Sequence, residues 1–252
     1  MHGWVSIGFL AFFFVSLAVG VRLVLLWRRT RALPELLIGI GVLGIGPIGF
    51  GGMMLASLLV ARGAAPADSL APRALFALAT ATIYLGVLAK CVFNWRVYRP
   101  QAALPALVTG AIGLALVVLY AHAGVARGFA PARLVDGWTL AQSALQVGAL
   151  LWGAGEALRY WQLMRRRLAL GLADPVVTNR FLLWALGAGA AGIGTAIGTL
   201  ASFATGRASL ELDWVVASSS LHGLASALAM GLAVLPPRAY TAWIRARAGA
   251  PA

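Results

Sequence analysis

Four ionisable side chains lie well inside long apolar stretches of the sequence: Arg22, Lys90, Glu156 and Arg159. A charge at this depth in a bilayer costs about 2.5–3.5 kcal/mol and usually has a partner. Glu156 and Arg159 are spaced i, i+3 and can pair on one helix face. We therefore expect Glu156 to be ionised and paired with Lys90, Arg22 or Arg159. For the basic side chains the alternative is that they extend to the interface.

A second set of side chains is polar and uncharged, and it falls in the halves of several apolar runs that we expect to face outward. The set comprises Tyr84, Gln142, Gln146, Thr195, Thr199, Ser219 and His222. Such side chains can line an outward-opening ligand pocket, or they can form hydrogen bonds between helices, each worth roughly 0.6 kcal/mol. We expect no metal or haem at His222, because no second intramembrane histidine faces it.

Glycine and proline interrupt two of the apolar runs, at 39–52 and 187–198. Pro47 has no N–H for the carbonyl of Leu43, and Gly46 beside it leaves the chain flexible. Gly194 begins a Gly-x-x-x-Gly pattern that lets helices approach closely. The sequence therefore predicts a hinge and a kink at Pro47 with a polar cavity beside it; close packing alone is the alternative.

Enzymatic chemistry is not expected from the motifs. The sequence has no HExxH, no paired intramembrane aspartates, no Ser/His/Asp set at plausible depth and no phosphate-binding glycine loop. Cys91 is the sole cysteine, so it forms no internal disulfide. A retinal pigment of the microbial type needs a lysine on its last helix, and the run 213–235 has none. We expect no catalytic residue, no metal and no cofactor.

Seven apolar runs must position these side chains. They are Trp4–Trp27, Pro34–Val60, Pro72–Trp95, Leu104–His122, Trp138–Leu163, Arg180–Thr205 and Asp213–Leu235. A helix crossing about 30 Å of hydrocarbon needs roughly 20 mainly apolar residues, so each run is long enough to span. The sequence predicts one all-α integral membrane domain over residues 1–252, a seven-helix bundle.

Arginine placement predicts the orientation. Nearly all of the net charge of +13 lies on the face that carries the junctions after the first, third, fifth and seventh runs. Short positive loops stay in the cytoplasm, so we expect a bacterial inner-membrane protein with a periplasmic N-terminus and a cytoplasmic C-terminus. The same charge attracts anionic headgroups, which makes nucleic acid an unexpected partner. The tail 238–247 mixes aromatic and basic residues and is expected to lie on the membrane.

An internal repeat is suggested by overlaying 1–100 on 138–243, with the helix 104–122 as connector. The matching pairs are Arg22 with Arg159, Pro34 with Pro175, and Tyr98 with Tyr240. A parallel duplication of three helices explains them, as in some transporters. The alternative is that two cytoplasmic junctions match in arginine without common origin.

Three stretches, RYWQLMRRRLALGLADPVVTNRFLLW (159–184), FNWRVYRP (93–100) and LPPRAYTAW (235–243), resemble an uncharacterised bacterial seven-helix family. They are loosely similar to the seven-helix membrane sensor modules of histidine kinases. The resemblance implies a sensor-like membrane module and no particular ligand. The topology also resembles that of SWEET-type sugar transporters, although their prolines on the first helix of each repeat are absent here.

These observations favour a non-enzymatic, receptor-like or accessory membrane module. Its outward polar pocket would take a small or lipophilic ligand, and its basic cytoplasmic face would bind a cytosolic signalling partner. The alternative is a small-solute transporter in which one three-helix half moves against the other.

Overall fold

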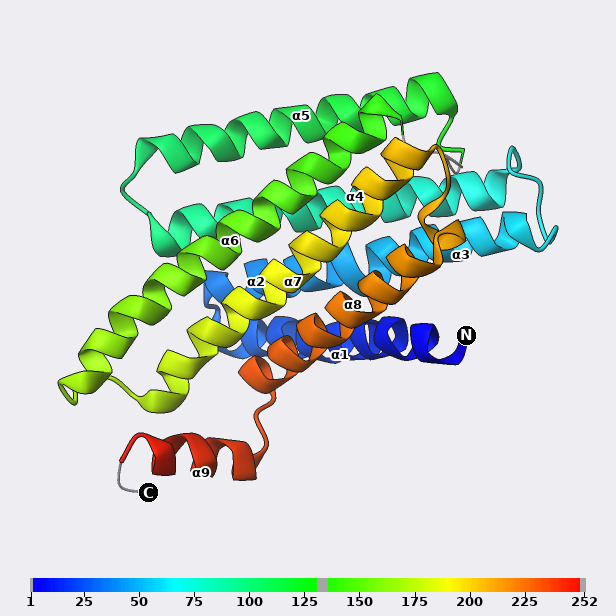
Figure 1. Ribbon diagram of the computed structural model, residues 1–252. Coiled ribbons are helices and arrows are strands. Elements are labelled where there is room, and N and C mark those ends of the chain that lie inside the picture. Colours follow the sequence, from blue (N-terminus) through cyan, green and yellow to red (C-terminus); the bar gives the residue numbers. More distant parts are fainter. Residues whose placement is uncertain (1, 131–135, 250–252) are drawn as a thin grey trace.

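The computed structural model describes residues 2–130 and 136–249, and within these ranges the chain is helical with no strand (Figure 1). The long helices are α1 (His2–Thr30), α2 (Leu33–Leu43), α3 (Gly51–Ala61), α4 (Leu70–Phe93), α5 (Ala103–Arg127), α6 (Gly137–Ala169), α7 (Pro175–Thr205), α8 (Asp213–Val234) and α9 (Arg238–Arg247). Short elements are the π-helical segments η1 (Gly44–Phe50) and η2 (Asn94–Tyr98) and the 3-10 turn η3 (Ser209–Glu211).

Six helical segments are long and apolar enough to cross a membrane, so the chain is a multi-pass membrane protein. They are Ile7–Thr30, Leu33–Ala61, Leu70–Tyr98, Ala103–Arg127, Pro175–Thr205 and Asp213–Val234. The remaining predicted run, Trp138–Leu163, lies in α6. That helix has 33 residues but not the required apolarity, because glutamines, Glu156 and several arginines interrupt it. Six of the seven expected spans therefore qualify, and α6 runs the length of the bundle beside α7 (Figure 1).

Six structural units close into a ring. Each packs on the next in the order α1, the interrupted helix (α2, η1 and α3), α4, α6, α7 and α8, and α8 packs back on α1. α5 lies outside this ring, against α4 and more weakly against α6, at the outer edge of the bundle (Figure 1). Only 17% of the apolar segment of α5 is buried, so most of its surface is left for lipid.

Local sequence sets the helix boundaries. Asp136 accepts the N–H of Thr139 at 2.8 Å, and Asp174 accepts the N–H of Val177 at 2.9 Å, so both act as N-caps. Pro175 then occupies the first position of α7, where its missing N–H removes no helical bond. At the other end of α7, Gly206 takes a positive φ of 63°, a conformation that glycine adopts without a steric penalty.

The interrupted helix changes register at Pro47. The segment η1 is π-helical, and the N–H of Gly51 bonds the carbonyl of Gly46 five residues back. The π-helical register accommodates Pro47, which has no backbone N–H to donate. The break sits where the helix meets α4: a methyl group added at Gly44 would lie 2.4 Å from the carbonyl oxygen of Thr82. The expected interruption at Pro47 is therefore present, together with the close packing that was its alternative.

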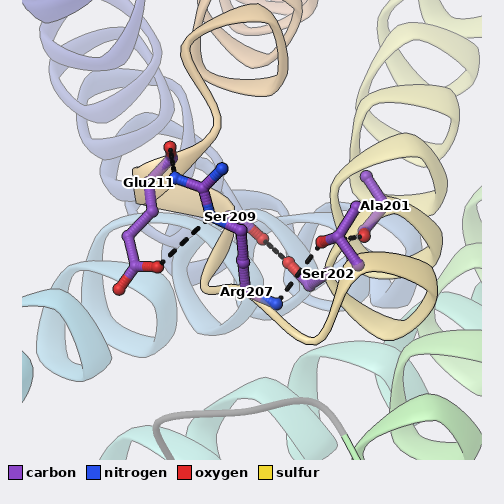
Figure 2. Close-up of polar contacts among 6 residues, drawn as sticks. Ala201, Ser202, Arg207, Ser209 and Glu211 are labelled. Carbon is purple, nitrogen blue, oxygen red and sulfur yellow. Dashed lines mark hydrogen bonds and ion pairs between the residues drawn. The ribbon is translucent and has the colours of Figure 1, made fainter.

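The connection between α7 and α8 is held by its own polar contacts (Figure 2). Ser209 Oγ donates to the carbonyl of Gly198 at 3.2 Å and lies 2.6 Å from Ser202 Oγ. Arg207 donates to the carbonyl of Glu211 at 3.0 Å, and the two side chains form an ion pair at 3.8 Å. We call the end of the bundle that carries the α7–α8 connection the far end, and we call the opposite end the α9 end.

The tail is the helix α9, which follows α8 after a short turn (Figure 1). Asn179 donates to the hydroxyl of Tyr240 at 2.7 Å, and Ile244 is buried, so α9 is attached to the start of α7. Trp243 is exposed, with Arg247 5.3 Å from its ring centroid. The aromatic and basic residues of the tail thus lie on a helix at one end of the bundle; its contact with lipid stays a prediction.

Candidate functional site: a lysine between two internal cavities

Lys90, the only lysine in the chain, points from α4 into the interior of the ring. Its Nζ lies 5.9 Å from the ring centroid of Trp184 on α7, a favourable distance for a cation–π contact. Its aliphatic part passes close to Gly153 on α6, where a built methyl group would lie 3.5 Å from Cε. A cation inside the ring is thereby held between α4, α6 and α7.

The first cavity has a volume of about 50 Å³ and is lined by residues from all six units of the ring. Since one water needs roughly 10–15 Å³, it has room for a few water molecules or one small ion. Its lining residues are Phe12, Ser16, Gly41, Val42, Ile45, Gly46, Lys90, Leu150, Trp184, Gly187, Ala188, Ala191, Ser226 and Met230. Within this lining the polar side-chain atoms are those of Lys90, two serines and the Trp184 indole.

The second cavity has a volume of about 90 Å³ and lies next to the first, toward the α9 end. The two share Lys90, Trp184 and Ala188. Asn94 is the other polar side chain of its interior, and Tyr98 lines it near the end of α4. Lys90 therefore stands where the two cavities meet.

Three polar atoms in these linings have no hydrogen-bond partner among the described residues: Ser16 Oγ, Ser226 Oγ and Asn94 Oδ1. All three residues are 0% exposed. Asn94 does use its amide nitrogen, which donates weakly to the carbonyl of Ala149 at 3.4 Å. Leaving a buried polar atom unpaired costs about 1–3 kcal/mol, so each of these atoms is a place where water or a solute binds favourably.

Glu156 lies beside this interior, on α6, and is only 6% exposed. Its Oε1 accepts Arg99 Nε at 2.5 Å, and its Oε2 is 3.7 Å from Arg159 Nη1. The expected pairing with Arg159 is therefore present as a long contact. Arg99 is a partner that was not predicted from the sequence; it follows the π-helical segment η2 and the helix end at Tyr98.

The other two expected partners of Glu156 lie elsewhere. Arg22 is exposed on α1, as expected for a side chain that reaches the interface. Lys90 has no carboxylate within ion-pair distance in residues 2–130 and 136–249. The four intramembrane ionisable groups thus separate into one paired cluster, one exposed arginine and one lysine without an acidic partner.

An aromatic cluster covers the α9 side of the second cavity. The rings of Tyr98 and Tyr160 are 4.9 Å apart, and those of Tyr160 and Phe181 are 5.7 Å apart. The Tyr160 hydroxyl donates to the carbonyl of Tyr98 at 3.5 Å. These three rings come from α6, α7 and the end of η2, and two of them, Tyr98 and Phe181, line the second cavity.

The side chains expected to form an outward pocket are only partly brought together. Tyr84 donates to Gln142 Oε1 at 3.1 Å, which joins α4 to α6. Thr195 and His222 instead use carbonyls of their own helices, those of Ala191 and Ser218. Gln146 and Thr199 are partly buried and Ser219 is exposed. None of the seven lines either of the two cavities described here.

The hinge residues have different positions. Gly46 lines the first cavity, Pro47 is buried in η1, and Gly194 packs against α8, where a methyl group would lie 2.8 Å from Cβ of His222. A cavity lies beside the proline break, but Lys90, Ser16 and Ser226 supply its polar atoms in place of the expected side chains, and its outward opening stays a prediction. In the described part of the chain no three His, Cys, Asp or Glu side chains are grouped so as to hold a metal.

The chain matches no family model, no curated protein sequence and no solved structure.

Proposed function

We propose that the protein is a carrier that moves a small solute across a bacterial inner membrane through the centre of the six-helix ring. One observation supports this function above the others: the first cavity takes lining residues from every unit of the ring, and none from α5. Binding near the middle of the bundle, between structural halves and beside a broken helix, is typical of secondary transporters.

The proposal includes seven crossings, with α6 as the seventh. The N-terminus would be periplasmic and α9 cytoplasmic, on the basis of arginine placement. It also includes a parallel repeat of 1–100 and 138–243, with α5 as the connector. The position of α5 outside the ring suits a connector between the two halves. The shift of 141 residues that places Pro34 on Pro175 also places Gly46 on Gly187, and both glycines line the first cavity.

Movement of one half against the other needs a place where a helix bends. The π-helical segment η1 supplies one, since its register differs from that of α2 and α3 on either side. Gly46 belongs to this segment and also lines the cavity, so a change of register there changes the cavity's shape. Opening toward the α9 end would further require the rings of Tyr98, Tyr160 and Phe181 to separate.

Solute flux into proteoliposomes tests the proposal. Stopped-flow light scattering would follow swelling in gradients of potassium formate, potassium chloride, urea and glycerol, with valinomycin present for the potassium salts. We expect flux of at least one solute, and loss of that flux in Ala188→Leu, which fills the junction of both cavities. Ala217→Leu is the matched control, because Ala217 is exposed on α8. Absence of flux for all four solutes, or equal flux in Ala188→Leu and wild type, would overturn the carrier.

The receptor-like function retains one supporting observation, the helix α9. It carries Arg238, Arg245 and Arg247 and is attached to α7 by Tyr240. A cytosolic signalling partner could bind there. Its test is co-purification from cells producing wild type or Asn179→Ala: a partner retained only by wild type supports the receptor, and no specific partner removes it.

A further inference from the structure

We infer that the first cavity is a binding site for a small monovalent anion, held by the ammonium of Lys90 and the hydroxyls of Ser16 and Ser226. This inference deepens the proposed function by naming the solute class. As the identity of the transported solute it rests on the proposed function, whereas binding of the anion in the cavity can be tested without transport.

The positive charge of Lys90 favours an anion in the cavity. Lys90 lies in the interior of the ring, and within residues 2–130 and 136–249 no acidic side chain is close enough to pair with it. Glu156, the nearest candidate by sequence depth, is already engaged by Arg99 and Arg159. Lys90 is partly buried. A cation inside the ring without a counter-ion is unfavourable, and an anion in the cavity would supply the missing charge.

The two serine hydroxyls in the cavity lining also favour an anion. Serine and threonine inside helices usually bond a carbonyl of their own helix, as Ser57 does to Met53 at 2.9 Å and Thr195 to Ala191 at 2.9 Å. Ser16 and Ser226 are equally helical and 0% exposed, yet each hydroxyl lacks a partner among the described residues. They come from α1 and α8 and line the same cavity as Lys90. An ammonium and two hydroxyls can all donate to one anion.

The volume and the lining of the first cavity restrict the kind of anion that can bind. About 50 Å³ accommodates one small ion such as chloride, nitrate or formate, but not a sugar or a nucleotide. The remaining lining is apolar or aromatic, which disfavours a polyvalent anion because one lysine would leave its second charge uncompensated. Asn94 Oδ1, an acceptor, belongs to the second cavity, where it can receive a hydrogen bond from water or from Lys90.

The experiment is equilibrium binding of chloride to the purified full-length protein in detergent, read as its thermal midpoint. Sodium chloride would replace sodium gluconate at constant ionic strength, since gluconate is too large for the cavity. We expect a saturable rise of the midpoint in wild type. Lys90→Met should lose it, and Ser16→Ala/Ser226→Ala should raise the apparent Kd roughly tenfold or more.

Two variants serve as controls. Thr80→Val removes an equally buried hydroxyl that also lacks a partner in the described chain but lines neither cavity. Arg22→Met removes an intramembrane positive charge on the exposed side of α1. Both should keep the chloride response, and if Lys90→Met does not fold, the double serine variant carries the test.

An equal response in wild type and in the double serine variant, or no saturable response in wild type, would overturn the anion site and leave the cavity to water. Chloride binding without flux would support the site and remove the carrier. Flux of urea or glycerol without chloride binding would support the carrier and remove the anion.

Discussion

Tyr84, Ser202 and His222, toward the far end of the ring, differ from Ser16 and Ser226, beside Lys90, in whether the protein itself satisfies their hydrogen bonds. Toward the far end, Tyr84 bonds Gln142, Ser202 bonds Ser209 and His222 bonds Ser218. Around Lys90 the hydroxyls of Ser16 and Ser226 have no partner in the described residues. Thr80 Oγ1 and Arg73 Nε on α4 also lack a partner in the described residues, but neither residue lines either of the two cavities. Intramembrane polarity alone therefore does not identify a site. Paired groups stabilise the helix packing, whereas unpaired groups beside a cavity are available for a solute.

Breaking the charge cluster next to the cavities should have the largest effect on stability. Glu156→Gln leaves Arg99 and Arg159 facing each other without their carboxylate. We expect the free energy of unfolding to fall by about 2 kcal/mol, less than for a fully buried pair because both arginines are half exposed and can turn to water. Unfolding in detergent measures this. Glu211→Gln, in an exposed pair, is the control; a loss as large there would show that burial is irrelevant.

Removing one member of a satisfied pair at the far end should have the next largest effect. Tyr84→Phe leaves the amide oxygen of Gln142 without its donor and should cost about 1 kcal/mol. In a double-mutant cycle with Gln142→Leu, the second change should cost less in the Tyr84→Phe background than in wild type. Strict additivity of the two costs would mean that this hydrogen bond contributes nothing to the packing of α4 on α6.

Restoring the missing N–H in the interrupted helix should leave stability nearly unchanged and alter the cavity. Pro47→Ala permits an α-helical register through η1, so we expect a change of less than about 1 kcal/mol in unfolding. Because Gly46 lines the first cavity, solute flux should fall several-fold at the same time. Flux equal to wild type in a folded Pro47→Ala protein would contradict a role for the π-helical segment in transport.

The smallest effect on stability should come from the unsatisfied hydroxyls, in contrast to Tyr84. Ser226→Ala removes an atom that has no protein partner in the described chain, so in chloride-free buffer the unfolding free energy should stay constant or rise by up to about 1 kcal/mol. A clear loss of stability in chloride-free buffer would show that the hydroxyl has a structural role and would remove the distinction between the two regions.

Much of the fold follows from hydropathy. The run predicted at Pro34–Val60 corresponds to Leu33–Ala61, and the one at Leu104–His122 lies inside Ala103–Arg127. α6 is the exception in apolarity: Gln142 accepts a hydrogen bond from Tyr84 of α4, and Glu156 pairs with Arg99 and Arg159. α5 and α4 show the limit of hydropathy, since both are apolar but only 17% of α5's segment is buried against 44% of α4's.

The candidate site was predicted only in its parts. Lys90, Glu156, Arg159 and the break near Pro47 could be found, because a charge or proline within an apolar run is visible in one segment. The cavity could not, since it depends on which faces of six units meet. Ser16 and Ser226 have no sequence signal beyond being serines in apolar runs. Arg99 was missed because it lies beyond the predicted apolar run. The π-helical segment η2 extends α4 to Tyr98, and Arg99 directly after it pairs with Glu156 on α6.

The most direct test of the central site is a crystal structure of the full chain grown in sodium bromide, with data collected at the bromine absorption edge. The expected result is an anomalous peak inside the ring, within about 3.5 Å of Lys90 Nζ and of the hydroxyls of Ser16 and Ser226, and no such peak in Lys90→Met. A wild-type structure with ordered bromide elsewhere but only water beside Lys90, or a peak that persists unchanged in Lys90→Met, would contradict an anion site at the centre of the ring.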